Sequence, residues 1–258
     1  MPSSDDHVRY ELVDAVARIT LDRAPVNALS LGMIRAVVAA FQRAAADDEA
    51  RAVVLRSAVP GRFSAGLDLG VILGSSGEEV RAFLQELYIN LADAQHGLGK
   101  PSVAAISGTA RGGGMTMAVS CDVILSAESA TFGYPEINVG VLPAIHFAHL
   151  PRIVGRHRAF ELLFTGRAFG PAEAKELGLV SRVVPDADLD GEAMRLASEF
   201  ASKSAAVMRH GRSAFMRQND LDYRRSVANA VEDFCNGVTS PAAQEGLRAF
   251  VEKRRPDW

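Results

Sequence analysis

The stretch SGTARGGGMTMAVSCD, residues 107–122, contains the densest glycine run of the chain. An apolar run leads into Gly112, Gly113 and Gly114, and a short apolar stretch follows, so we expect a buried strand, a tight turn and a short helix. Glycine tolerates positive φ and lets another group approach the backbone closely. The free N–H groups at a helix start favour negative charge. The stretch therefore predicts a site for an anion, or for an oxygen that becomes anionic during a reaction.

Two other interpretations of this glycine run stay open. One is a plain strand-to-helix turn without a ligand. The other is a degraded dinucleotide fingerprint, in which Gly108, Ala110 and Gly113 hold the small positions and Glu128 is the ribose-binding acid. A dinucleotide-binding strand–helix–strand unit takes roughly 30 residues, whereas the next apolar run here ends within about 25, which disfavours the dinucleotide.

The rest of the chain alternates between strand-like and helix-like patterns. The expected strands are at residues 8–13, 16–21, 52–57, 101–107, 121–129 and 179–185, the first two forming a hairpin. Ser30 is the expected N-cap of a helix, and residues 78–96 are helical in pattern. The recurrence of strand, glycine-bearing loop and helix predicts an α/β core over residues 1–190, followed by helices alone over 191–258.

The composition excludes several kinds of partner. The chain has 258 residues, is 48% hydrophobic and 23% charged, and carries a formal net charge of −3, which suits one large globular unit. No basic excess favours nucleic acid or an anionic membrane, and no run of about 18 apolar residues predicts a membrane span. The two cysteines suit a reducing compartment. The N-terminal MPSSDDHVRY lacks the layout of a targeting signal, so we expect a cytoplasmic protein.

Two acidic residues lie in loops that contain glycine or proline. Asp68, in RFSAGLDL, is either a base or the N-cap of the next turn, and the cap is favoured. Glu136, in FGYPEINVGVLP, is either a surface glutamate or a carboxylate among apolar neighbours that acts as acid or base. The residues alone leave both alternatives open.

Two groups of basic side chains have an ordinary structural interpretation. His146 and His149 are three residues apart without a third ligand type nearby, so we expect no metal site and two structural histidines. Lys253, Arg254 and Arg255 end an amphipathic helix, where they either contact phosphates or complement the helix C-terminus.

Taken together, several segments resemble the crotonase (enoyl-CoA hydratase/isomerase) superfamily in order and spacing. The matching segments are PVNALS (25–30), RFSAGLDL (62–69), KPSVAAISGTARGGG (100–114), CDVILSAESATFGYPEINVGVLP (121–143), LLFTGRAFGPAEAKELGLVSRVV (162–184) and EGLRAFVEKRRPDW (245–258). They span nearly the whole chain, and several are long, so the match is specific.

The resemblance implies a spiral of ββα repeats with a C-terminal helical region that builds a homotrimer or a dimer of trimers. It implies acyl-CoA thioester substrates that pass through an enolate, with no cofactor beyond the substrate's own coenzyme A. By motif position, the N–H groups of Ala65 and Gly113 would form the oxyanion hole, and Glu136 would be the acid/base.

The resemblance also assigns a substrate-binding set. Phe250 would lie near the adenine and Lys253 would contact a phosphate, often in a neighbouring subunit's site. The full set of substrate- and CoA-binding residues is Asn27, Ala28, Leu29, Ser64, Gly66, Leu67, Asp68, Gly112, Phe250 and Lys253.

The main departure from the superfamily is Thr116. The superfamily's hydratases carry two glutamates, one in the PE step, which is present as Glu136, and one at the position that Thr116 holds. A hydroxyl with a pKa far above 7 does not replace a carboxylate as base. We therefore expect single-glutamate isomerisation of an enoyl-CoA. The alternatives are hydration, CoA-thioester decarboxylation or hydrolysis on the same site, and a non-catalytic acyl-CoA-binding oligomer.

A second departure follows the glutamate loop. Members often have PGxGGTQRL there, whereas this chain has PAIHFAHL, residues 143–150. The bulk of His146 and Phe147 would narrow the acyl pocket, so we expect a short or unusually shaped acyl group.

Overall fold

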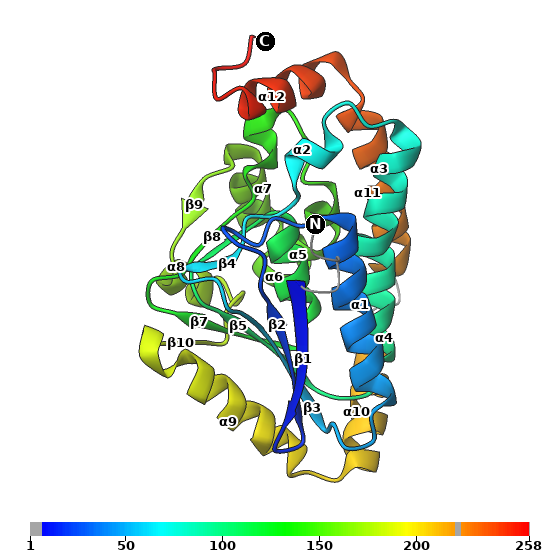
Figure 1. Ribbon diagram of the computed structural model, residues 1–258, viewed down its shortest axis with the longest axis vertical. Coiled ribbons are helices and arrows are strands. Elements are labelled where there is room, and N and C mark those ends of the chain that lie inside the picture. The colour runs from blue at the N-terminus through cyan, green and yellow to red at the C-terminus, as the bar shows by residue number, and fades with distance from the viewer. Residues whose placement is uncertain (1–6, 220–222, 258) are drawn as a thin grey trace.

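The computed structural model describes residues 7–219 and 223–257. Within these residues the strands form two sheets, one with the order β1–β2–β3–β5–β7–β10 and one with the order β4–β6–β8–β9. Figure 1 shows helices on both sides of the larger sheet, with α9 along one face and the group of α1, α3, α4 and α11 on the other side. This arrangement confirms the predicted α/β spiral.

The larger sheet opens with the predicted hairpin and continues as parallel strands. Its strands are β1 (Val8–Val13), β2 (Val16–Leu21), β3 (Ala52–Ser57), β5 (Ser102–Ile106), β7 (Val123–Ala127) and β10 (Arg182–Val184). Only β1 and β2 pair antiparallel; the other neighbours are parallel. Each of these strands lies within a segment that the sequence predicts.

Both faces of the larger sheet are buried. Successive side chains of a strand point to opposite faces, so Leu55 packs in the main core while its neighbour Val54 packs under α9 (Leu189–Ala201). Because both faces are covered, such strands are apolar throughout rather than alternating. The continuous apolar runs of the sequence follow from this double coverage.

The smaller sheet was not predicted as a sheet, although residues 130–143 have the pattern of a short strand followed by a loop, and this segment contains one of its strands, β8. Its strands are β4 (Arg62–Ser64), β6 (Thr109–Arg111), β8 (Thr131–Gly133) and β9 (Ala168–Phe169). β4, β6 and β8 run parallel to one another, and β9 pairs antiparallel with β8. Strands of two or three residues are too short to show a periodicity.

The helices follow the prediction with one irregularity. Ser30 caps α1 (Leu31–Ala46) by accepting the Met33 N–H, a cap that stabilises by about 1 kcal/mol. The predicted helix at 78–96 contains a π-helical segment, η2 (Gln85–Asn90), between α3 (Gly77–Leu84) and α4 (Leu91–Gly97). The remaining early helices are α2 (Leu69–Ile72), α5 (Gly113–Ser120), η3 (Pro135–Val139), α6 (Ala144–Val154), α7 (Arg156–Thr165), α8 (Pro171–Glu176) and η4 (Asp186–Asp188).

The C-terminal region is helical wherever the structure describes it. After α9 come α10 (Ala205–Asn219), α11 (Tyr223–Val238) and α12 (Pro241–Val251). α9 packs on the larger sheet and belongs to its core, whereas the proposed division of the chain near residue 190 stays a prediction. Within residues 7–219 and 223–257, none of the helices has the length and apolarity that a bilayer crossing requires.

Candidate active site

The three parallel strands of the smaller sheet place three segments at one edge. β4, β6 and β8 are neighbours in that order, so their carboxyl ends lie side by side. The chain leaves them into residues 65–68, 112–116 and 134–136. The carboxyl edge of parallel strands is where ligands bind in open α/β sheets. The segments that the sequence singles out separately therefore meet at one site.

The carboxylate of Glu136 lies against the glycine turn. Gly112 has φ of +46° and is the N-cap of α5, and its N–H donates to the Gly133 carbonyl at 3.2 Å. A Cβ on Gly112 would lie 2.6 Å from Glu136 Oε1. The bare backbone is thus needed twice, for the positive φ and for the approach of the carboxylate.

We expect Gly112→Ala to remove activity as well as stability. An L-residue at positive φ costs about 1–2 kcal/mol, and the new methyl would also displace the Glu136 carboxylate. Gly74→Ala is the matched control, because Gly74 has φ of +78° with open space around its Cβ position. Chemical unfolding should show a loss in both variants, and turnover of an enoyl-CoA should fall only in Gly112→Ala. Equal activity in the two variants would contradict the role of this contact.

The loop after β4 corrects one predicted oxyanion-hole donor. The Ala65 N–H donates to the Val26 carbonyl at 2.9 Å, so it is already engaged. Gly66 follows with φ of +88°, and a Cβ there would lie 2.8 Å from the Arg111 carbonyl oxygen and 3.3 Å from the Gly113 nitrogen. The loop backbone therefore lies directly against the glycine turn.

Leu67 takes the place of Ala65 as the candidate donor. Leu67 and Leu29 form an isolated parallel β-bridge. Its hydrogen bonds use the residues on either side of Leu67: the Leu29 N–H donates to the Gly66 carbonyl, and the Asp68 N–H donates to the Leu29 carbonyl. In the described part of the chain, neither the Leu67 N–H nor the Gly113 N–H donates a backbone hydrogen bond. A Cβ on Gly113 would lie 3.2 Å from Leu67 Cδ2. These two N–H groups are therefore the candidate donors to a thioester oxygen.

Three buried polar atoms near this edge lack a hydrogen-bond partner among the described residues: Thr116 Oγ1, Tyr134 Oη and Glu136 Oε2. Buried polar groups without partners are rare in folded proteins and are common where a ligand binds. Thr116 is 7% exposed and lies one helical turn after Gly112, whose carbonyl accepts the Thr116 N–H at 3.1 Å. The side chain of Glu136 is 17% exposed.

The phenols around Glu136 are held neutral. Burial and, secondarily, the negative charge of Glu136 raise the pKa of Tyr134. The same two causes, in the same order, raise the pKa of Tyr88 well above its usual value. The hydroxyl of Tyr134 is therefore a hydrogen-bond donor rather than an anion. Tyr134 follows β8 and precedes Glu136 by two residues, and this proximity in the sequence is the signal for a site residue that was not predicted.

Several residues of the predicted substrate-binding set hold the loops instead. Asn27 is fully buried; its Oδ1 accepts the Arg23 N–H, and its Nδ2 donates to Ser57 Oγ and the Phe63 carbonyl. The hydroxyl of Ser64 donates to the Asn27 carbonyl and accepts the Gly66 N–H. These side chains shape the loops, and the part that the backbone of the two segments takes in coenzyme A binding stays a prediction.

Asp68 is also a loop-holding residue. It stands at the N-cap position of α2, but its side chain makes no cap hydrogen bond, so the predicted cap is wrong. Its Oδ2 instead accepts both Arg23 Nη1 and Nη2 at 3.0 Å. Asp68 therefore fixes the loop of residues 23–28, which includes Ala28, against the loop after β4.

The remaining predicted residues lie on neighbouring elements. α12, which carries Phe250, packs against η3 and α2, so it is next to the segments that carry Glu136 and follow Asp68. Phe250 is 57% exposed, and Lys253 follows the helix in an exposed turn. Phe147 stacks on Phe164 of α7, with ring centroids 5.8 Å apart. Their roles toward a substrate stay predictions.

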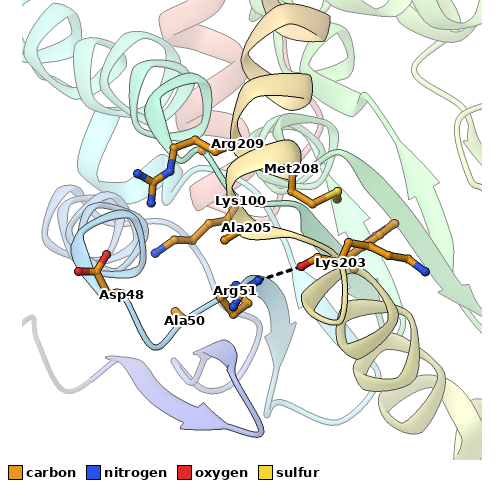
Figure 2. Close-up of a pocket in the computed structure, with 10 residues that line it drawn as sticks. Asp48, Ala50, Arg51, Lys100, Lys203, Ala205, Met208 and Arg209 are labelled. Atoms are coloured by element: carbon orange, nitrogen blue, oxygen red, sulfur yellow. Dashed lines mark hydrogen bonds between the residues drawn. The ribbon is translucent and has the colours of Figure 1, made fainter.

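A small cavity lined by basic residues lies outside the candidate active site, and its residues have a structural role. Figure 2 shows Lys100, Arg51 and Arg209 around it, with Arg51 bonded to the Lys203 carbonyl. Its volume is about 110 Å³. Lys100 Nζ donates to the carbonyls of Ala44, Ala45 and Asp47 at the end of α1, which uses all three of its protons. A lysine at this position stabilises the negative end of the helix.

The comparisons with known proteins place this fold among acyl-CoA-processing enzymes. The sequence model of the enoyl-CoA hydratase/isomerase family matches residues 11–258. The chain is 33% identical to a probable enoyl-CoA hydratase of Bacillus subtilis, over 94% of this chain and 95% of the relative. It is 34% identical to human mitochondrial methylglutaconyl-CoA hydratase, over 90% of this chain and 70% of the relative.

Solved structures agree with these sequence matches. An enoyl-CoA hydratase from Mycobacterium avium subsp. paratuberculosis superposes with a TM-score of 0.86 at 26% identity, over 98% of each chain. An enoyl-CoA hydratase/isomerase from Xanthobacter autotrophicus gives 0.86 at 30% identity, over 96% of this chain and 97% of the other. The chain belongs to the enoyl-CoA hydratase/isomerase family.

Proposed function

We propose that this chain moves the double bond of a 3-enoyl-CoA to the 2-position with Glu136 as its one acid/base. The observation that carries the proposal is the pairing of Glu136 with the glycine turn, while the hydroxyl of Thr116 stands on the same turn's helix. Asp68, the other nearby acid of the motifs, is bound to Arg23.

The proposed reaction proceeds through a dienolate. The thioester oxygen lies between the N–H groups of Leu67 and Gly113, and Glu136 takes a proton from C2. Negative charge then develops on the oxygen, where each fixed donor is worth about 10²–10³-fold in rate. Glu136 then delivers a proton to C4, so no net proton is gained or lost. One carboxylate is sufficient for this cycle.

Hydration is the second candidate, because the named relatives are called hydratases. Hydration needs one group to activate water and another to handle the C2 proton, and Thr116 is a poor substitute for the second carboxylate. Incubation with a 3-enoyl-CoA, with 2-enoyl-CoA and 3-hydroxyacyl-CoA both followed, tests the proposal. The isomerisation proposal is refuted if 3-hydroxyacyl-CoA is the sole product or if no reaction occurs. The same product analysis on other acyl-CoA esters detects decarboxylation or hydrolysis, and a complete lack of turnover with tight acyl-CoA binding would indicate a binding protein.

We expect Lys253→Ala to weaken the binding of coenzyme A esters. An exposed ammonium–phosphate contact contributes up to about 1 kcal/mol, so KM should rise about two- to fivefold with kcat unchanged. A pantetheine thioester, which lacks the distal phosphates, should show no change. Lys203→Ala, at the exposed junction of α9 and α10, is the matched control. An unchanged KM for the coenzyme A ester would remove Lys253 from the site.

The assembly and location of the chain also belong to the proposal. A homotrimer or a dimer of trimers built by α10–α12 would place exposed α12 residues beside another subunit. We propose a cytoplasmic enzyme whose reaction uses no metal and no cofactor beyond the coenzyme A of its substrate.

A further inference from the structure

A pair of histidines extends inward from Glu136. His146 and His149 lie on one face of α6, and His146 Nδ1 and His149 Nε2 are hydrogen-bonded at 2.8 Å. His146 Nε2 lies 3.4 Å from Glu136 Oε1. The two atoms are within ion-pair distance but are not aligned as a hydrogen bond. Three titratable groups therefore follow one another in a continuous line.

Both imidazoles are almost completely buried. His146 is 1% and His149 is 5% exposed, and the Tyr134 ring packs on His146 with centroids 4.4 Å apart. Burial and, secondarily, the His146 ring hold the pKa of His149 well below its usual value. A neutral imidazole has one donor and one acceptor nitrogen, and the bond between His146 Nδ1 and His149 Nε2 has one ring as donor and the other as acceptor. The pair can therefore pass a proton along without holding a charge.

The line ends at a second cavity on the far side of α5. This cavity has a volume of about 620 Å³, and His149 lines it together with Ser120, Cys121 and Asp122 at the C-terminal end of α5. Gly113 is at the other end of the same helix, about 12 Å away for eight residues. The exposed Asp93 and Arg152 also line the cavity, so it reaches the surface of the described chain.

We propose that His146 and His149 are relay residues that connect Glu136 to water in this second cavity. The proposal rests on the enolate chemistry proposed above and deepens it. The Glu136 side chain is 17% exposed, and in the proposed complex the acyl group would cover this exposed part, which would close the direct route of water to the carboxylate. The histidine pair supplies the other route.

The relay moves one proton per event and leaves both imidazoles neutral, while Glu136 returns to its carboxylate form and the proton passes to water. His146 carries its proton on Nδ1, which donates to His149 Nε2, and His146 Nε2 is left as an acceptor facing Glu136. Two acceptors face each other before the proton arrives, which agrees with their long separation of 3.4 Å. When Glu136 has taken the C2 proton, it passes it to His146 Nε2, the Nδ1 proton moves to His149 Nε2, and the His149 Nδ1 proton leaves to water. The reverse sequence returns a proton from water to Glu136 for delivery to C4.

The test follows solvent deuterium into the product. Unlabelled 3-enoyl-CoA is converted in D₂O, and deuterium at C4 is measured by mass spectrometry after one turnover. With the relay, most product molecules carry deuterium at C4. In His149→Gln, whose amide accepts the His146 N–H but passes no proton on, deuterium at C4 should fall at least about tenfold, since a positioned proton carrier contributes about 10²–10⁴-fold. Unchanged deuterium content would overturn the relay.

Two further variants separate the relay from a purely structural role. His96→Gln changes a histidine that lines the same cavity, and it should leave the deuterium content unchanged; a fall equal to that of His149→Gln would overturn the proposal. His149→Ala should lose the exchange and regain it when imidazole is added, because the truncated side chain leaves space beside the cavity. No recovery with imidazole in a folded variant would also count against the relay.

A measurement without substrate keeps the inference separate from the reaction. Nitrogen-15 NMR of the histidine rings should show the His146 proton on Nδ1, and Glu136→Gln should shift the resonances of both rings. A proton on Nε2 of His146, or a His149 ring that does not respond to Glu136→Gln, overturns the relay even if the protein isomerises enoyl-CoA esters. If it does not isomerise them while the rings respond as expected, the reaction assignment fails and the relay stands.

Discussion

Glu136→Gln is expected to remove double-bond migration and to leave the fold intact. The amide keeps the size of the side chain and its place against Gly112, but it has no basic oxygen for the C2 proton. Positioned acid/base groups contribute about 10²–10⁴-fold, and here one group serves both steps, so kcat should fall by at least about 10³-fold. The formation of 2-enoyl-CoA from 3-enoyl-CoA by the two proteins is the measurement.

The control for this prediction is Glu128→Gln. Glu128 is an exposed glutamate after β7, outside the site, and its replacement should leave kcat unchanged. Thermal unfolding of both variants shows whether the fold is retained. Similar activity of Glu136→Gln and the unchanged protein would remove Glu136 from its role.

Thr116→Glu is expected to give the protein hydratase activity. The Thr116 hydroxyl has no partner in the described chain and sits one turn after Gly112 on α5. A carboxylate there would share the site with Glu136, and two close carboxylates separate their pKa values, so that one acts as acid and the other as base. Hydration of 2-enoyl-CoA should rise by about 10²-fold, the lower end of the contribution of a general base.

Thr116→Gln separates the carboxylate from its bulk. Glutamine fills the same volume without a base, so its hydration rate should stay at the level of the unchanged protein. A rise in Thr116→Gln equal to that in Thr116→Glu would show that shape, and not a second carboxylate, limits hydration. No rise in a folded Thr116→Glu would show that the position of Thr116 is not that of a second base.

The sequence predicted the larger sheet and the glycine turn because both are encoded locally. The parallel strands are buried on both faces, so their apolar runs are continuous and easily found. Gly112 and Gly113 mark a turn where φ is positive and a helix begins, which is a property of a few neighbouring residues. The family resemblance then related this turn to Glu136, which lies beyond two intervening strands, β7 and β8.

The rest of the site depends on contacts between distant segments. Ala65 was the predicted donor, but the Val26 carbonyl, which lies far away in the sequence, takes its N–H. The cap predicted for Asp68 is overridden by Arg23 in the same way. His146 and His149 were predicted to be structural histidines. In the structure Glu136 lies against the His146 ring and a cavity lies against the His149 ring, and their spacing in the sequence does not show either neighbour. Local patterns do not contain such pairings.

With a single carboxylate, this site should move a double bond more efficiently than it adds water. The most direct measurement is kcat/KM for isomerisation of a 3-enoyl-CoA and for hydration of the corresponding 2-enoyl-CoA on one preparation of the unchanged protein. Isomerisation should exceed hydration by about 10²-fold or more, which is the contribution of the missing general base. Hydration equal to or faster than isomerisation would contradict it.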